Sequence, residues 1–312
     1  MPLTWTGRVG PRIEVPPLRR PDVWLVSAHH GRWPSRAPVV GVLWEVGWHT
    51  EYLRSLLSPW FVELIEEGTR RGVQDCAWLI VPAESSKAQA IEAYGYDPDR
   101  IAVVPLGVDL TTFHPDRQGG AELVARAQLG SDAPYVLFAG NLGPRKNLTA
   151  LREAMVELAE RGLPHRLVVV AGPAHDRRGE EPPELIGELP GWPGRFVRIK
   201  RPTDVELATL MAGADAFCLP SLTEGFGLPV LEAMACGTPV VTSNRGSLPE
   251  VVGDAGLVVE PTGPALAEAL YTLLSDATRR AQLGEVSRRR AETMSWDRTA
   301  EGWLAVLRKA AA

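Results

Sequence analysis

The sequence predicts an α/β fold with parallel sheets. Short apolar segments typical of strands alternate with amphipathic segments typical of helices almost throughout the chain. The chain has 312 residues, which is enough for two domains of ordinary size. Its hydrophobic content of 45% and charged content of 23% are those of a soluble globular protein.

The first part of the chain is expected to form a small sheet covered by helices. Apolar runs predict strands at 22–28, 38–44, 77–81 and 101–104. Amphipathic runs predict helices at 59–71 and 85–94, the first with Ser58 as its N-cap and Pro59 at its first position. Residues 105–115 contain several turn residues and predict an irregular segment.

A second series of strands and helices begins at about residue 135. Its predicted strands lie at 135–139, Arg166–Ala171, 195–199, 214–219, 239–242 and 256–259. Helices are predicted at 148–161, at 204–211 and over most of 262–293, with a final helix after Ser295. Thr203 and Glu206 have the spacing of a capping box, which marks the start of one of these helices.

Charge and cysteine content exclude several classes of function. A net charge of −5 argues against a general nucleic-acid surface. No apolar run approaches the ~20 residues of a membrane span, and the N-terminus lacks the apolar core of a signal peptide. Cys76, Cys218 and Cys236 are widely spaced, so we expect buried, reduced thiols in a cytoplasmic protein. No Cys/His spacing indicates a zinc site.

The stretch 220–239 carries the most informative pattern in the chain. After a predicted strand, Gly225 and Gly227 let backbone N–H groups approach a ligand without a Cβ clash. A helix is predicted over 228–236, with Pro229 at its start and a glycine after its end. The free N–H groups at the start of such a helix favour an anion such as a diphosphate.

Two glutamates, Glu224 and Glu232, lie eight positions apart around this helix start. Glu224 precedes the helix, beside the expected anion. Glu232 lies one turn in, where a carboxylate can accept two hydrogen bonds from a ribose diol. Either glutamate alone is best interpreted as a solvated side chain, but the pattern as a whole indicates a nucleotide-sugar site.

A basic turn upstream is the second candidate for ligand binding. Gly140 follows a predicted strand, and Arg145 and Lys146 precede a predicted helix. Arg145 can bind phosphate oxygens through its planar fork, while Lys146 supplies a point charge. A solvated basic turn is the alternative, but the place between strand and helix favours diphosphate binding. The segment lacks G-x-G-x-x-G, so it is not a dinucleotide-binding loop.

These segments resemble the donor site of glycosyltransferase family 4. Glu224 and Glu232 match the family's E-x7-E motif, and the similarity continues over 240–261. The resemblance implies the GT-B fold, in which two Rossmann-like domains face each other across a cleft. It implies an acceptor-side domain at 1–115, shorter than is usual, and a nucleotide-sugar domain at 116–295. A last helix at 296–312 is expected to pack back on the first domain.

The resemblance also implies an activity. We expect transfer of a hexose from a nucleoside-diphosphate sugar to a glycan, lipid-linked or small-molecule acceptor, as in polysaccharide biosynthesis, with retention of anomeric configuration. The expected catalytic residues are Arg145 and Lys146, which stabilise the leaving diphosphate, and Glu224, which orients the donor sugar. The segments that resemble the donor site contain no Asp-x-Asp, so we expect neither metal nor cofactor. The donor-binding residues so implied are Gly140, Arg145, Lys146, Glu224, Gly225, Phe226, Gly227, Leu228 and Glu232.

The N-terminal part departs from the family's pattern. The usual opening strand with its Gly-rich loop is missing or vestigial, and Gly7 and Gly10 are a poor substitute. Trp44-Glu45 stands where family members tend to have a His-Asp pair. Histidines near this segment are candidates for a polar role toward an acceptor, although a lone histidine is more often structural. The acceptor-side candidates are His29, His30, Trp44 and His49.

Several alternatives stay open at this point. Seven of the ten tryptophans fall in the first 80 residues among many arginines, which allows peripheral membrane contact at the inner face, although a solvated basic tail fits the same residues. The shortened first domain allows a nucleotide-sugar-binding protein or subunit that needs a partner for catalysis. A GT-B sugar-nucleotide epimerase and an incomplete gene product are further alternatives.

Overall fold

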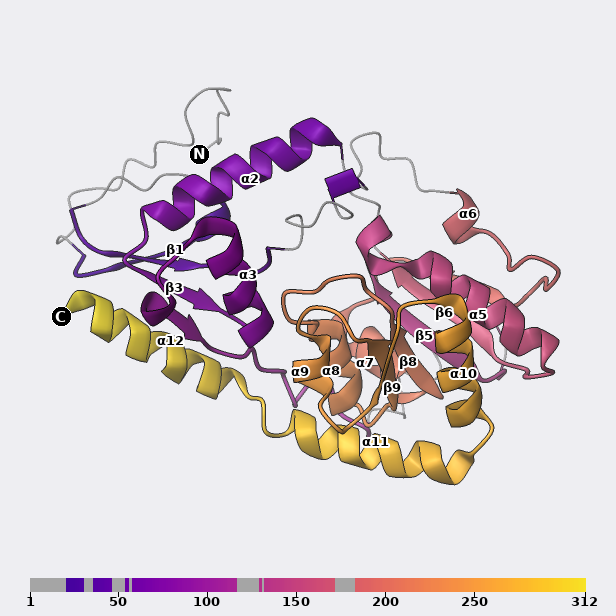
Figure 1. Ribbon diagram of the computed structural model, residues 1–312. Coiled ribbons are helices and arrows are strands. Elements are labelled where there is room, and N and C mark those ends of the chain that lie inside the picture. The colour runs from indigo at the N-terminus through magenta and orange to yellow at the C-terminus, as the bar shows by residue number, and fades with distance from the viewer. Residues whose placement is uncertain are drawn as a thin grey trace, which may run out of the picture.

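The computed structural model of the chain describes residues 21–30, 36–46, 54–55, 58–116, 129–130, 132–171 and 183–312. The described residues form two lobes, each built on a parallel sheet (Figure 1). All described strand pairs are parallel, with order β1-β2-β3-β4 in the N-terminal sheet and β10-β9-β8-β5-β6-β7 in the C-terminal sheet.

The N-terminal sheet is covered on both faces. Its strands are β1 (Trp24–Ser27), β2 (Val39–Val42), β3 (Trp78–Val81) and β4 (Ile101–Val103). Its own helical elements are η1 (Ala28–His30), α2 (Pro59–Gln74), α3 (Glu84–Tyr94) and η3 (Pro98–Arg100). Alternation along β2 sends Val39 into a core shared with α2 and α3, while Val40 and Val42 point to the other face.

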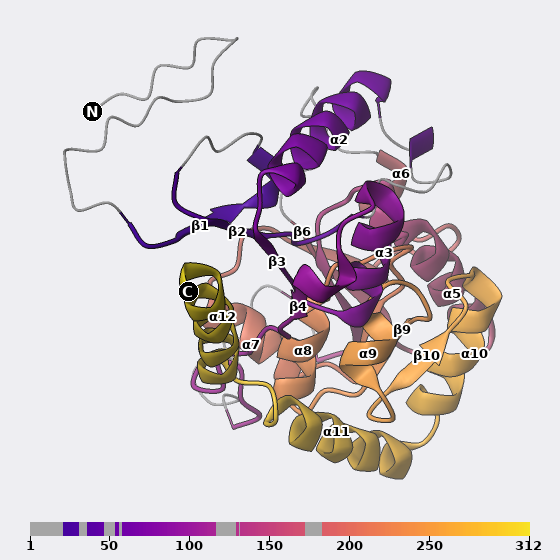
Figure 2. The same cartoon turned by 60° about the vertical axis from the view of Figure 1, so that its left-hand side comes forward.

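The second face of that sheet is covered by α12 (Trp296–Ala311), the last helix of the chain (Figures 1 and 2). Val306 packs with Val40, Val42 and Ile80. The chain thus passes between the lobes twice. The two connecting segments touch where the backbone N–H of Val108 donates to Met294 O at 3.2 Å. The helix α12 contacts β2 and β3. The domain boundaries at 115 and 295 stay a prediction.

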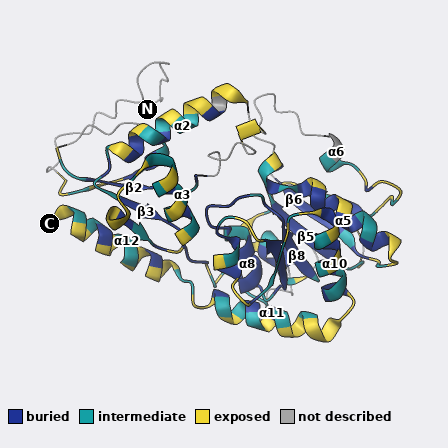
Figure 3. Cartoon of the chain, in the orientation of Figure 1, coloured by how far each residue is buried: buried dark blue, intermediate teal, exposed yellow. Residues whose placement is uncertain are grey.

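The C-terminal sheet lies at the centre of a larger core (Figure 3). Its strands are β5 (Tyr135–Gly140), β6 (Arg166–Ala171), β7 (Phe196–Ile199), β8 (Ala216–Leu219), β9 (Val240–Ser243) and β10 (Leu257–Val259). Its helical elements are η4 (Pro144–Lys146), α5 (Leu148–Glu160), α6 (Pro183–Ile186), α7 (Asp204–Ala212), α8 (Leu228–Ala235), α9 (Leu248–Val252), α10 (Gly263–Leu274) and α11 (Ala277–Ala291). Every residue of β8 and β9 is buried, and the two polar side chains at the end of β9, Thr242 and Ser243, donate hydrogen bonds to the carbonyl oxygens of Leu219 and Ser221.

The strands and helices expected from the sequence are present, with ends that differ by a few residues. The predicted capping box of Thr203 and Glu206 is confirmed, and all three cysteines are buried and free as expected. Residues 244–253 contain α9, which was not among the predicted helices; Pro249 lies in its first turn and does not break it. No helix among the described residues is long and apolar enough to span a bilayer.

Candidate functional site

The candidate site lies where the order of the C-terminal sheet reverses. From β5 the chain moves outward through β6 and β7, then returns to β8 on the other side of β5. In open α/β sheets, ligands bind at the carboxyl ends of the strands at such a switch point. Arg145 and Lys146 follow β5, and Glu224 follows β8, so topology brings these predicted residues together.

Glu224 is buried at the centre of this group, with 6% of its surface exposed. Its Oε1 accepts hydrogen bonds from Lys146 Nζ and from Ser221 Oγ, the latter at 2.6 Å. Its Oε2 lies 3.1 Å from Arg145 Nη1. Lys146 is equally buried, so each of these two charges has the other as a partner away from solvent. Sequence reasoning did not predict this pairing.

The pKa shifts follow from burial and charge. Burial alone would raise the pKa of Glu224, but Lys146 and Arg145 outweigh it and hold the pKa below its ordinary value. Burial lowers the pKa of Lys146, although Glu224 opposes this. For Arg145, burial is outweighed by Glu224 and Glu45, and the pKa is raised. The Glu224 carboxylate is therefore ionised at neutral pH.

The loop between β8 and α8 is shaped by glycine. Gly227 has a φ of 96°, in the left-handed region, and forms the N-cap of α8 without a side-chain cap. Phe226 is buried, while Leu228 at the first turn is half-buried. Gly140, at the end of β5, lies against the stem of Lys146, since a Cβ there would be 3.5 Å from Lys146 Cε. The start of α8 therefore has no capping side chain, and ligand binding there stays a prediction.

Glu232 lies one turn into α8 and is half-buried. Burial, together with the charge of Asp204 at the start of α7, raises the pKa of Glu232 to about 7. A carboxyl group with this pKa changes its ionisation near neutral pH. Hydrogen-bond donors placed against it would favour the charged form.

The two lobes meet directly at the loop between β8 and α8. Gly225 lies so close to Trp44 that a Cβ would overlap the Trp44 carbonyl oxygen. The carbonyl oxygen of Gly225 accepts a hydrogen bond from Ser86 Oγ at 3.1 Å. Arg145 Nη2 lies 3.4 Å from Oε2 of Glu45, which follows β2. The carboxyl end of the N-terminal sheet therefore faces the candidate site.

A further contact between the lobes involves Glu250 of α9. Its two carboxylate oxygens accept hydrogen bonds from the backbone N–H groups of Glu84 and Ser85, each at 2.8 Å. The N-cap of α3 is Ala83, which has no side-chain acceptor, so Glu250 supplies the cap from the other lobe. Glu250 was not singled out in the sequence, although the start of α3 at Ala83 has no side-chain acceptor of its own.

Two of the acceptor-side candidates lie near this boundary. Trp44 follows β2, is 39% exposed, and its ring centroid is 5.9 Å from that of Trp303 on α12. The backbone N–H of Trp44 donates to His29 Nε2 at 3.3 Å, and His29 Nδ1 lies 3.1 Å from Thr69 Oγ1. This arrangement requires an unprotonated Nε2. His30 ends η1, and His49, like Gly7 and Gly10, lies outside the described residues.

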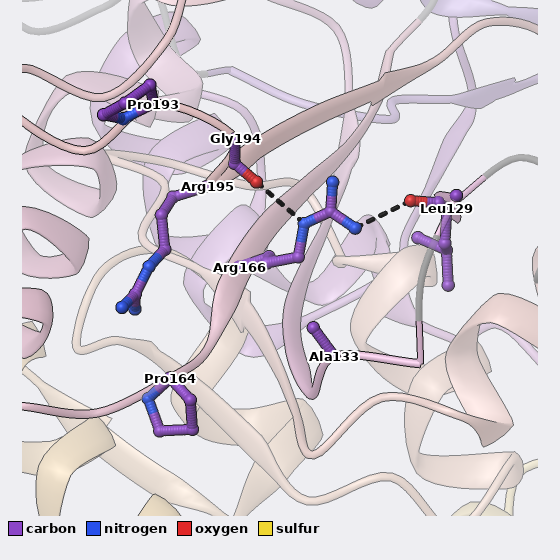
Figure 4. A pocket seen from close by; sticks show the side chains of 8 residues that line it. Leu129, Ala133, Pro164, Arg166, Pro193, Gly194 and Arg195 are labelled. Carbon is purple, nitrogen blue, oxygen red and sulfur yellow. Dashed lines mark hydrogen bonds between the residues drawn. The ribbon is translucent and has the colours of Figure 1, made fainter.

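A separate pocket lies at the amino ends of strands of the C-terminal sheet, away from the candidate site (Figure 4). Arg166, the first residue of β6, donates there to Gly194 O at 3.0 Å and to Leu129 O at 2.7 Å. The amino ends of parallel strands do not form the usual ligand site. Within the described ranges, no three His, Cys, Asp or Glu side chains are grouped so as to hold a metal ion.

Comparison with known proteins gives matches over both lobes. A family described as "Glycosyl transferases group 1" matches residues 122–290, and one described as "Glycosyltransferase Family 4" matches residues 10–112. The D-inositol 3-phosphate glycosyltransferase of Kineococcus radiotolerans is 36% identical over 261 residues, which are 78% of this chain and 59% of that protein. The chain spans between 54% and 59% of the first three such relatives.

Solved structures share the fold. The sucrose-phosphate synthase of Thermosynechococcus elongatus has a TM-score of 0.73 at 24% identity, over 88% of this chain and 68% of that one. The Anabaena protein HepE, crystallised with UDP and glucose, has a TM-score of 0.71 at 22% identity, over 88% of this chain and 72% of that one. The two parallel sheets and these similarities confirm the predicted GT-B fold.

Proposed function

This chain belongs to glycosyltransferase family 4, and from that premise we propose that it transfers a hexose from a nucleoside-diphosphate sugar to a hydroxyl-bearing acceptor. The observation that carries the proposal is the group of Arg145, Lys146 and Glu224 at the switch point of the C-terminal sheet. The named relatives, which are D-inositol 3-phosphate glycosyltransferases, support a small polar or glycan acceptor.

The proposed chemistry follows from where charge develops. When the sugar leaves, negative charge grows on the distal phosphate of the nucleotide. Arg145, Lys146 and the start of α8 would stabilise this charge, so we propose that no metal is needed. Glu224 would orient the hydroxyls of the donor sugar and hold the two cations in place. The acceptor would enter from the side of Trp44. The transfer would retain the anomeric configuration of the donor.

The proposal is tested by a transfer assay with the purified chain. UDP-glucose, its GDP and ADP counterparts and the matching N-acetylglucosamine donors are each offered with inositol phosphates and short glycans, with and without EDTA. We expect the protein to use one of these donors and EDTA to leave the rate unchanged. NMR of the product should show the donor's anomeric configuration. Inversion would contradict the mechanism.

The same assay separates the alternatives. Binding of a sugar nucleotide without transfer or hydrolysis would favour a binding protein or a subunit that needs a partner. A 2-epimer formed without acceptor would favour the epimerase. Absence of binding for every nucleotide would contradict the donor site itself.

Glu232 gives the proposal a pH signature. If its carboxylate accepts hydrogen bonds from the ribose diol, binding needs the ionised form. With a pKa of about 7, raising the pH from 6 to 8 should strengthen ribonucleotide binding roughly tenfold. Calorimetry on wild type, on Glu232→Gln and with the 2′-deoxynucleotide checks this. The pH effect should vanish in the variant and with the deoxy ligand; the same pH slope in all three would exclude a ribose role for Glu232.

A further inference from the structure

Glu45 is the one member of the charged group that comes from the N-terminal lobe. Its Oε2 lies 3.4 Å from Arg145 Nη2, and the side chains of both residues are 29% exposed. Glu224, on the other side of the same guanidinium, has only 7% of its side chain exposed. Arg145 therefore lies between a buried carboxylate and a more accessible one.

The charges of this group balance. Arg145 and Lys146 carry two positive charges, and Glu45 and Glu224 carry two negative ones, so the formal sum is zero. A diphosphate is bound by cations and gains little from a neutral group. If the Glu224 carboxylate moved away, the Lys146 ammonium would stay buried without its partner. Glu45 can turn toward solvent at a smaller cost, because its side chain is partly exposed and Arg145 keeps Glu224 as a partner.

We propose that Glu45 competes with the diphosphate of the donor for Arg145, so that donor binding exchanges the Glu45–Arg145 ion pair for contacts between Arg145 and phosphate. This inference rests on the proposed function of the same site. The exchange breaks no covalent bond. Since Glu45 belongs to the N-terminal lobe, it also couples the nucleotide to the contact between the lobes. Glu45 thereby lowers affinity for nucleoside diphosphates and sets how readily they are released.

A second carboxylate that crosses between the lobes provides a matched control. Glu250 of α9 caps the backbone of α3, since its carboxylate accepts hydrogen bonds from Glu84 N and Ser85 N and contacts neither Arg145 nor Lys146. Removing its charge weakens a contact between the lobes without changing the charge beside Arg145. Glu45→Gln and Glu250→Gln together separate the two effects.

The experiment measures affinities of UDP, GDP, ADP and the matching nucleosides by calorimetry. Wild type, Glu45→Gln, Glu45→Asp, Glu250→Gln and Arg145→Ala are compared. Glu45→Gln should bind the preferred nucleoside diphosphate about tenfold more tightly, which is about 1.4 kcal/mol, with nucleoside affinity unchanged. Glu45→Asp and Glu250→Gln should resemble wild type, and Arg145→Ala should lose diphosphate affinity. The gain in Glu45→Gln should shrink at high salt.

The outcomes distinguish this inference from the proposed function. Unchanged or weaker diphosphate binding in Glu45→Gln, with wild type binding and Arg145→Ala impaired, overturns the competition and leaves the donor site standing. Equal tightening in Glu45→Gln and Glu250→Gln also overturns it, since loosening of the lobes would then be the cause. If no variant and no wild-type protein binds any nucleoside diphosphate, the donor site and the competition fall together.

Discussion

Replacement of Glu224 by alanine is expected to lower the free energy of unfolding by about 3–5 kcal/mol, because Lys146 is left buried without its carboxylate. Arg145 and Ser221 lose a partner as well. Urea denaturation of wild type and variant measures this loss. A change below about 1 kcal/mol would show that Lys146 reaches solvent and that the buried pair is not structural.

The control for this prediction removes both charges. A double variant, Lys146→Met with Glu224→Leu, fills the space with apolar side chains and should be more stable than Glu224→Ala alone. Any loss of transfer in Glu224→Ala must be read together with this loss of stability. Glu224→Gln keeps the volume and one acceptor for Lys146, so it is the variant in which transfer should be assayed. If the double variant is the less stable one, Lys146 is not the source of the cost.

Gly225→Ala is expected to reduce kcat/KM by roughly 100-fold, since misplacement of reacting groups by about 1 Å can have an effect of that size. The added Cβ would overlap the backbone carbonyl of Trp44, which cannot rotate away, so the lobes must separate at this point. Gly225 is not in the left-handed region, so the fold of the C-terminal lobe should persist. The same Cβ would lie 3.0 Å from Glu45 Cβ, so Glu45 should move away from Arg145 and nucleoside-diphosphate affinity should rise toward that of Glu45→Gln.

Gly68→Ala in α2 is the matched control, because a Cβ there would lie 3.4 Å from His29 O, an ordinary contact. It should leave kcat/KM close to wild type. Small-angle scattering should show a larger radius of gyration for Gly225→Ala than for wild type. The control Gly68→Ala should show no increase. Full activity in Gly225→Ala would mean that the contact between Gly225 and Trp44 is not part of the working arrangement.

Much of the fold could be predicted because periodicity and turn residues are local. The strand Arg166–Ala171 and the capping box of Thr203 are examples, since a few neighbouring residues determine each. The helix α9 was not predicted, because its five residues are too few to show a helical periodicity.

The candidate site was predicted residue by residue but not as an arrangement. Arg145, Lys146 and Glu224 were predicted from their places after strands, while the pairing of Lys146 with Glu224 joins positions 78 apart and depends on the order of the strands. Glu45 was noted only as a departure from a family pattern. Its contact with Arg145 depends on how the two lobes meet, which no local pattern encodes.

The cover that α12 provides for the N-terminal sheet has a consequence for synthesis on the ribosome. Val40, Val42 and Ile80 emerge early, but Val306, which packs on them, emerges more than two hundred residues later. At bacterial and eukaryotic translation rates this is a delay on the order of 10–40 s. Meanwhile all six strands of the other sheet, from β5 to β10, have left the ribosome. The C-terminal lobe can thus fold during translation, whereas the N-terminal lobe keeps one apolar face uncovered until the last helix arrives, and that face is the natural target of a chaperone.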